Sequence, residues 1–145
     1  MTRQEQVKEF MVKAGQECPK RASVPPPEVR ALRVRLIAEE LAELCDAFGV
    51  SLVLESCPGR PPIITVSVHD SVYPEIVAAY DAVLDLEVVT TGTAVAMGVD
   101  TEPGWQEVHR SNMSKFIDGT KRADGKWVKG PSYSPANLKP IVDAQ

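Results

Sequence analysis

Two apolar helical segments of this chain each carry a cluster of carboxylates, and this pairing most constrains how the chain can fold. The first cluster is the run EELAE at residues 39–43, and the second contains Asp81 and Asp85. No arginine or lysine follows any of these acids within one helical turn, and Arg35 is one possible partner for Glu39. An ionised carboxylate that is buried without a partner costs several kcal/mol. So much negative charge therefore indicates a cation site, and oxygen ligands of this kind suit Mg²⁺ or Mn²⁺.

Apolar spacing and helix-ending residues predict an all-α chain. The third and fourth helices should each begin near a proline, and the second should follow the prolines at 25–27. Glycines at 15, 49 and 98 are typical of the positions where the first three helices end. A Gly-, Lys- and Pro-rich tail follows from Asp118, with a short turn near Leu138. The four predicted helices span about residues 3–14, 27–48, 74–97 and 103–116.

A β-hairpin is expected between the second and third helices. The runs at 50–54 and 63–68 are rich in β-branched residues, and the segment CPGRPP separates them. Turn residues between two such runs favour a hairpin, and the alternative is an irregular linker. Because a bare hairpin would present an unpaired edge, we expect another subunit to cover the insertion at about 50–70.

A helical wheel places the acids on apolar stripes. Glu39, Glu40 and Glu43 share an arc of roughly 100° with leucines one and two turns earlier. Asp81 and Asp85 share a stripe with the valines and leucines of the third helix. We therefore expect both clusters to face the core, although exposed acids on amphipathic helices are the simpler alternative. A di-iron site is excluded, because it needs Glu-x-x-His on two helices and neither histidine has that spacing.

Composition narrows the function classes. A chain of 145 residues is expected to form one domain, residues 1–145. Its net charge of −4 argues against a nucleic-acid polymer as partner. Three cysteines without CxxC spacing indicate free thiols in a reducing, cytoplasmic setting. No run of eighteen apolar residues is present, so no membrane span is expected.

With these motifs located, the chain resembles the all-α nucleoside triphosphate pyrophosphohydrolases, the superfamily of MazG, dimeric dUTPases and phosphoribosyl-ATP pyrophosphohydrolase. The resemblance covers about residues 7–138, with 50–70 unmatched. It implies a MazG-like four-helix bundle core with the tail at about 118–145 closing on the site. EExxE alone is a weak signal, but EExxE followed by EVHRSNMSK and DGK is specific. The matching pieces are EELAE (39–43), LD (84–85), GTA (92–94), GVD (98–100), EVHRSNMSK (107–115), DGK (124–126) and KGP (129–131).

One position departs from the family pattern. The second acidic motif of the family is usually Glu-x-x-Asp, and Ala82 occupies the glutamate position here. Asp81 lies one residue earlier, four before Asp85, so it falls on the same helix face. We expect Asp81 to supply the missing carboxylate, through a side chain shorter by one methylene.

The resemblance implies cleavage of a nucleoside triphosphate between its α- and β-phosphates, with Mg²⁺ or Mn²⁺, two or more ions per site, bridging the carboxylates and the substrate. Glu40, Glu43 and Asp85 are the expected metal ligands, with Asp81 as a fourth. Glu39 is expected to orient or deprotonate the attacking water, or to hold a further ion, so Glu39 and Glu40 are the catalytic candidates.

The resemblance also assigns substrate contacts and an assembly. Asn112 and Lys115 match the family's phosphate-facing stretch, and two tail lysines are expected to close over the same group. For each lysine the simpler alternative is a solvated surface charge. Relatives with one such domain form homo-oligomers, as dimers or dimers of dimers. The further candidates are Lys126 and Lys129 for the phosphates, and Phe10, Gln16 and Trp127 for the nucleobase.

Several functions stay open at this point. The expected activity is a metal-dependent (deoxy)nucleoside triphosphate pyrophosphohydrolase, with a purine dNTP such as dGTP favoured because Ala82 departs from the dUTPase-like motif. A dUTP diphosphatase and a catalytically inactive nucleotide- or metal-binding protein are the alternatives. A phosphoribosyl-ATP enzyme is a third, which the EVHRSNMSK stretch does not favour.

Overall fold

The computed structural model describes residues 1–56 and 58–145, and the chain divides into two compact units. The terminal unit comprises Met1–Val24 with Ala94–Gln145, and the central unit comprises Pro25–Thr93. Each unit is described by itself below. The single domain expected from length alone stays a prediction.

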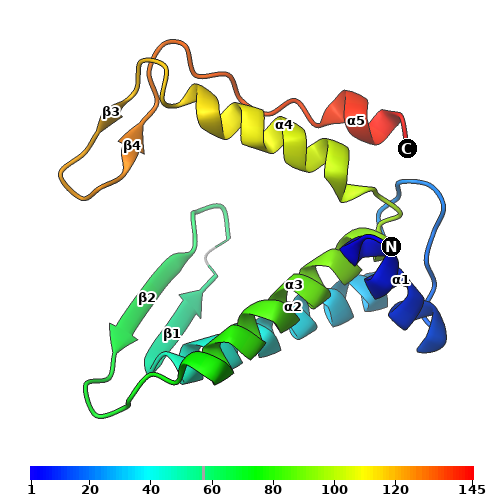
Figure 1. Cartoon of the computed structure of the whole chain (residues 1–145), viewed down its shortest axis with the longest axis horizontal. Helices are drawn as coiled ribbons and strands as arrows, with labels where there is room; N and C mark the ends of the chain where they lie inside the picture. The colour runs from blue at the N-terminus through cyan, green and yellow to red at the C-terminus, as the bar shows by residue number, and fades with distance from the viewer. Residues whose placement is uncertain (57) are drawn as a thin grey trace. The chain divides into compact units, whose positions relative to one another are not determined.

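The central unit consists of two helices joined by a hairpin (Figure 1). Helix α2 (Pro27–Ala47) starts at consecutive prolines and ends before Gly49, which adopts a φ of 63°. Helix α3 (Ile76–Ala96) then returns beside α2, and the Glu75 amide donates to the Ala47 carbonyl oxygen at 3.0 Å. The last residues of α3 already belong to the terminal unit.

The predicted hairpin is confirmed. Strands β1 (Val50–Glu55) and β2 (Ile63–Val68) pair antiparallel, in a register that runs from Val50 opposite Val68 to Glu55 opposite Ile63. Alternate positions divide the hairpin into an apolar face and a more polar face. The apolar face is formed by the cross-strand pairs Val50–Val68, Leu52–Val66 and Leu54–Ile64.

The terminal unit holds the remaining elements. Helix α1 (Arg3–Lys13) begins with a capping box between Thr2 and Glu5, and helix α4 (Thr101–Ser114) begins at Asp100, whose carboxylate caps the Glu102 amide at 3.0 Å. The core of the terminal unit is formed by Val7, Met11, Val95 and Ala96. The other elements are β3 (Thr120–Lys121), β4 (Trp127–Val128) and α5 (Lys139–Asp143).

The four long helices agree with their predicted bounds to within about two residues, so the all-α prediction with a β-hairpin insertion is confirmed. The pairing of β3 with β4 was not predicted. Its turn contains Asp124 and Gly125, where the Asp124 side chain accepts from the Lys126 amide at 3.1 Å and Gly125 has a φ of 85°. Within the described residues, no single helix has the length and apolar character needed to cross a membrane.

Candidate functional site

The two acidic clusters of the central unit meet at Glu40. Burial raises the pKa of Glu40 above its ordinary value, and the neighbouring charges raise it further. Those charges come from both helices, since Glu39 and Glu43 lie on α2 whereas Asp81 and Asp85 lie on α3. The fold therefore brings all five predicted carboxylates into one electrostatic neighbourhood.

Two small residues of α3 are buried in the central unit. On α3, Ala79 and Ala82 are buried, and they lie three residues apart on one face. On α2, the less exposed positions include Leu36, Glu40 and Leu44, which are spaced by four. Glu40 therefore lies on the inner, less exposed face of α2.

The expectation that both clusters face the core is wrong for the single chain. Glu39, Glu43 and Asp81 are exposed, while Glu40 and Asp85 are half-buried. Val77, Leu84 and Val88, which share their stripe on α3, are exposed as well, whereas Val95 near the end of the helix is buried. The reason is that the buried face of α3 is the one that carries Ala79 and Ala82, and the acids lie on a different side of the helix.

The described residues offer these acids no salt-bridge partner. No salt bridge in the described part of the chain involves any of the five carboxylates. Across the same residues, no three Asp, Glu, His or Cys side chains lie close enough together to hold one ion as they stand. Since like charges repel, exposed carboxylates on a helix surface spread apart, and closing around a cation would need side-chain rotation. The excess of negative charge at Glu40 is the feature that fits a divalent cation.

Three of the predicted phosphate-binding residues gather in the terminal unit. Lys115 Nζ donates to Asn112 Oδ1 at 2.8 Å, and Lys129 Nζ lies 4.1 Å from the centroid of the Tyr133 ring. Hydrogen bonds to Ser111 and Lys129, followed by the charges of Lys129 and Lys115, lower the pKa of Tyr133. Both lysines therefore influence the pKa of Tyr133. Lys126 lies at the β3–β4 turn.

Hydrogen bonds from side chains of α4 to the backbone of residues 134–137 attach the tail to this helix, and Tyr133 lies just before these residues. Ser114 Oγ accepts from the Ser134 amide at 3.0 Å, and Arg110 donates to the Pro135 carbonyl oxygen at 3.2 Å. Glu107 Oε1 accepts from the Asn137 amide at 2.8 Å, and the Arg110 side chain, more than the Asn137 amide, lowers the pKa of Glu107 to about 2.

The three candidates for the nucleobase lie apart from the hollow of the terminal unit described below. Trp127 packs edge-to-face on Phe116, with ring centroids 4.9 Å apart. Phe10 is exposed on α1, and Gln16 is half-buried after it. A hollow of about 390 Å³ in this unit is lined by residues of α1, the following loop and the α3–α4 connection, and none of the three belongs to it.

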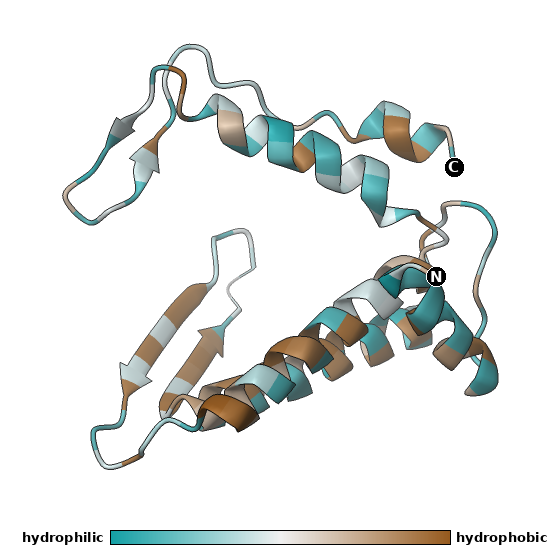
Figure 2. Cartoon of the chain, viewed as in Figure 1, coloured by the Kyte–Doolittle hydropathy of each residue, from teal (hydrophilic) through white to brown (hydrophobic). Residues whose placement is uncertain are grey.

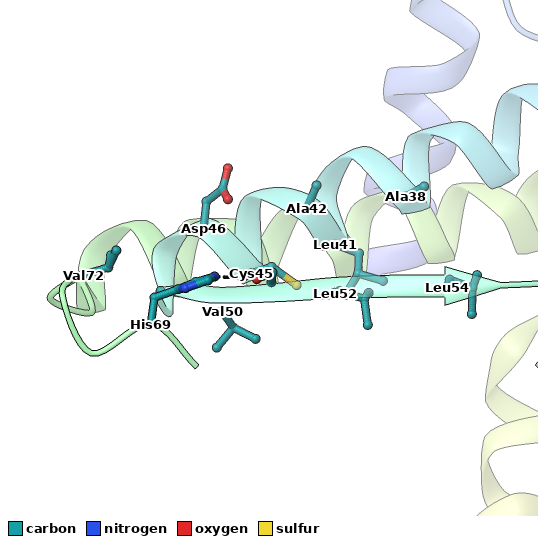
Figure 3. Close-up of a pocket in the computed structure, with 12 residues that line it drawn as sticks. Ala38, Leu41, Ala42, Cys45, Asp46, Val50, Leu52, Leu54, His69 and Val72 are labelled. Atoms are coloured by element: carbon teal, nitrogen blue, oxygen red, sulfur yellow. Dashed lines mark hydrogen bonds between the residues drawn. The ribbon is translucent and has the colours of Figure 1, made fainter. Parts of the chain in front are cut away.

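The central unit contains a larger, open groove of about 570 Å³ between α2 and β1. Figure 3 shows Leu41 and Cys45 of α2 above Val50 and Leu52 of β1. At one end the Ser51 hydroxyl is hydrogen-bonded to the imidazole of His69. The helical positions that line the groove lie on the side of α2 away from the glutamates. The groove is therefore separate from the carboxylate cluster.

Sequence reasoning missed two of these residues, Ser111 and Tyr133. Ser111 lies inside the EVHRSNMSK motif and is buried, and Tyr133 lies four residues after Lys129. The motif itself was a usable signal for Ser111. Nothing local marked Tyr133, because its place depends on how the tail folds back onto α4.

Comparison with known proteins agrees with the motifs. The sequence matches the family model described as phosphoribosyl-ATP pyrophosphohydrolase over residues 7–112. This segment contains all five carboxylates and ends at Asn112, so the lysines at 115, 126 and 129 lie beyond it. A search of curated proteins gave no match.

Proposed function

Because the chain belongs to the phosphoribosyl-ATP pyrophosphohydrolase family, we propose that it is a metal-dependent nucleoside triphosphate pyrophosphohydrolase. The proposed reaction is dNTP and water to dNMP and pyrophosphate. The observation that carries the proposal is the convergence of two acidic clusters on Glu40, whose pKa all four neighbouring carboxylates raise. A site with this much negative charge attracts a polyanionic substrate only when cations accompany it.

The proposed ligands are Glu40, Glu43 and Asp85, with Asp81 as the fourth. When bound, Mg²⁺ or Mn²⁺ would offset the charge of the triphosphate and polarise the phosphate at the scissile bond. Glu39 is exposed at the edge of the cluster, where its carboxylate can accept a hydrogen bond from the attacking water. In this scheme Glu39 orients the water, and the other carboxylates hold the cations.

The terminal unit is proposed to supply the positive charge for the leaving pyrophosphate. Lys115 is hydrogen-bonded to Asn112, and the Lys129 ammonium lies over the Tyr133 ring; within the described residues, neither forms a salt bridge with an acid. Such groups suit a phosphate oxygen. Lys126 is kept as a further phosphate contact, and Phe10, Gln16 and Trp127 as contacts to the base.

Among deoxynucleotides, a purine dNTP such as dGTP is the favoured substrate, with dUTP as the alternative. A second candidate substrate is phosphoribosyl-ATP, and the family match over residues 7–112 is the observation that favours it. An inactive nucleotide- or metal-binding protein is the remaining possibility, with Ala82 as the disabling change.

A substrate panel tests the proposal. The full chain is incubated with the four dNTPs, dUTP and phosphoribosyl-ATP, with Mg²⁺ or Mn²⁺, and pyrophosphate and orthophosphate are measured separately. We expect pyrophosphate as the first phosphorus product, and no turnover in excess chelator. Orthophosphate as the first product, or full activity in chelator, would contradict the mechanism. Nucleotide binding without any turnover would favour the inactive binding protein.

A further inference from the structure

Two lysines of the terminal unit are held by neutral groups rather than by acids. Lys115 is bound by the Asn112 amide oxygen at 2.8 Å, and the Lys129 ammonium lies over the Tyr133 ring at 4.1 Å. Three other cations of the chain, at Lys13, Arg110 and Lys139, each form a salt bridge with a carboxylate. An aromatic face orients an ammonium group by cation–π attraction and leaves its positive charge in place.

Tyr133 is itself held firmly. The Ser134 amide that follows it is bound to the buried Ser114 hydroxyl at 3.0 Å, and the Ser132 amide before it is bound to both Asp118 carboxylate oxygens, at 3.0 and 3.2 Å. The tyrosine side chain is half-buried and contacts the buried Ser111 of α4. The backbone on both sides of Tyr133 is thus hydrogen-bonded, and its side chain contacts α4.

We infer that Tyr133 is a positioning residue, which holds the Lys129 ammonium in the neighbourhood of Lys115 so that both cations bind the polyphosphate group of the substrate. The inference deepens the proposed function and rests on it for the identity of the ligand. Its physical basis is separate, because an ammonium ordered in advance loses less side-chain entropy when an anion binds. Without the ring, Lys129 would be an ordinary mobile lysine on an exposed strand end.

The test uses the full chain and inorganic tripolyphosphate, titrated calorimetrically at low ionic strength in the presence of chelator. Tyr133→Leu should weaken binding about tenfold, and Tyr133→Phe should weaken it less than about threefold, because phenylalanine keeps the ring. Lys129→Met should weaken binding about as much as Tyr133→Leu. The double variant Tyr133→Leu with Lys129→Met should be no weaker than Lys129→Met alone, since Tyr133 acts through Lys129.

Matched controls are Tyr73→Leu, at an exposed tyrosine of the central unit, and Lys139→Met, at a lysine paired with Asp143. Both should bind tripolyphosphate like the unmodified chain. Unchanged binding in Tyr133→Leu, equal losses in the phenylalanine and leucine variants, or additive losses in the double variant would each overturn the inference.

A second measurement does not depend on the folding of any variant. In the unmodified chain with labelled lysines, the ε-methylene resonance of Lys129 should be shifted upfield by the Tyr133 ring and should move on addition of tripolyphosphate, whereas that of Lys139 should not. A Lys129 resonance at the ordinary lysine position would overturn the inference. If tripolyphosphate binding depends on Tyr133 while no nucleotide is hydrolysed, the proposed function fails and the anion site stands. If nucleotides are hydrolysed but Tyr133 has no influence on binding, only the inference fails.

Discussion

In the described part of the central unit, Glu40 is the acid whose pKa is raised by burial and by neighbouring carboxylates. It lies on the inner face of α2, where burial and four other carboxylates raise its pKa. An acid whose pKa is raised by folding stabilises the folded state below its unfolded value, and this contribution is lost as pH rises through the folded value. At neutral pH, and without cations, an ionised Glu40 therefore destabilises the fold.

Replacement of Glu40 by glutamine should separate activity from stability. Glu40→Gln should lower kcat by about a hundredfold or more, as loss of a metal ligand commonly does. The same change should raise the Tm of the metal-free chain at pH 7 but not at pH 4, because the carboxylate is largely protonated at the lower pH. Calorimetric melts at both pH values and steady-state kinetics check this.

Glu17→Gln is the matched control for this comparison, because Glu17 is exposed in the loop after α1. It should alter neither kcat nor Tm. Added Mg²⁺ or Mn²⁺ should raise the Tm of the unmodified chain more than that of Glu40→Gln. A lower metal-free Tm for Glu40→Gln at pH 7 would contradict the electrostatic account.

Asp81 decides whether the departure at Ala82 is compensated. Asp81→Ala should lower kcat/KM by more than about tenfold, a loss of about 1.4 kcal/mol in transition-state stabilisation, and should weaken metal binding. Adding Ala82→Glu should restore part of both, since the carboxylate returns to the family's usual position. Because Ala82 is only 3% exposed, the restored variant should also melt lower than Asp81→Ala without metal. A loss below tenfold for Asp81→Ala would remove Asp81 from the ligand set.

At the scale of elements, the sequence predicted what local signals control. Gly15, Gly49 and Gly98 end their helices with positive φ values, and the β-branched runs form the expected hairpin. The short β3–β4 hairpin was not predicted, because strands of two residues are too short to show alternation of polar and apolar residues. Its Asp-Gly turn is nevertheless a known hairpin signal.

The sequence indicated which residues belong to the candidate site better than it indicated where their side chains lie. The spacing of the acids predicted one helix face for each cluster, and the family resemblance implied a shared site. The pKa of Glu40 is raised by acids of both clusters, as such a site would require. Their exposure could not be predicted, because the face of α3 that is buried carries Ala79 and Ala82 and not the stripe of acids and valines. The position of the Tyr133 ring beside Lys129 depends on hydrogen bonds between α4 and the tail, such as the one from the Ser134 amide to the Ser114 hydroxyl. These residues are 20 positions apart in the sequence, so no local pattern reveals the contact.

The fastening of the tail can be tested at Gly130. A Cβ at this position would lie 2.2 Å from Asp118 Oδ1 and 2.5 Å from the Asp118 carbonyl oxygen, so alanine cannot fit without displacing backbone. Gly130→Ala should lower stability by about 1–3 kcal/mol in denaturant unfolding and release the Ser132 amide from Asp118.

Gly104→Ala provides the opposite control within the same unit. Gly104 lies inside α4, and the nearest atom to an added Cβ is 4.0 Å away on Leu138. This substitution should therefore stabilise the chain by about 0.5–1 kcal/mol, because glycine is a poor helix former. Equal effects of the two substitutions would mean that the close approach at Gly130 does not hold the tail.

At the scale of the whole molecule, the central unit exposes more apolar surface than a single soluble chain usually does. On β2, Ile64, Val66 and Val68 are 61%, 59% and 72% exposed, and on α3 the early residues Ile76 and Val77 are 76% and 69% exposed. Figure 2 shows hydrophobic residues along both elements. Contiguous apolar surface of this kind marks an interaction site. We expect a second copy of the chain to cover it, as a dimer or a dimer of dimers.

The hairpin is the element on which this assembly should depend. Replacing residues 51–67 with a short Gly/Ser linker should give a smaller species in light scattering, because it removes most of the apolar face formed by β1 and β2. A finer variant, Ile64→Ser with Val66→Ser, changes only that face and should also reduce the mass. Ser67→Asn, on the opposite face of the same strand, is the control and should leave the mass unchanged. If the mass is unchanged in the deletion as well, the hairpin packs within its own chain, and the expectation that a second copy covers it is wrong.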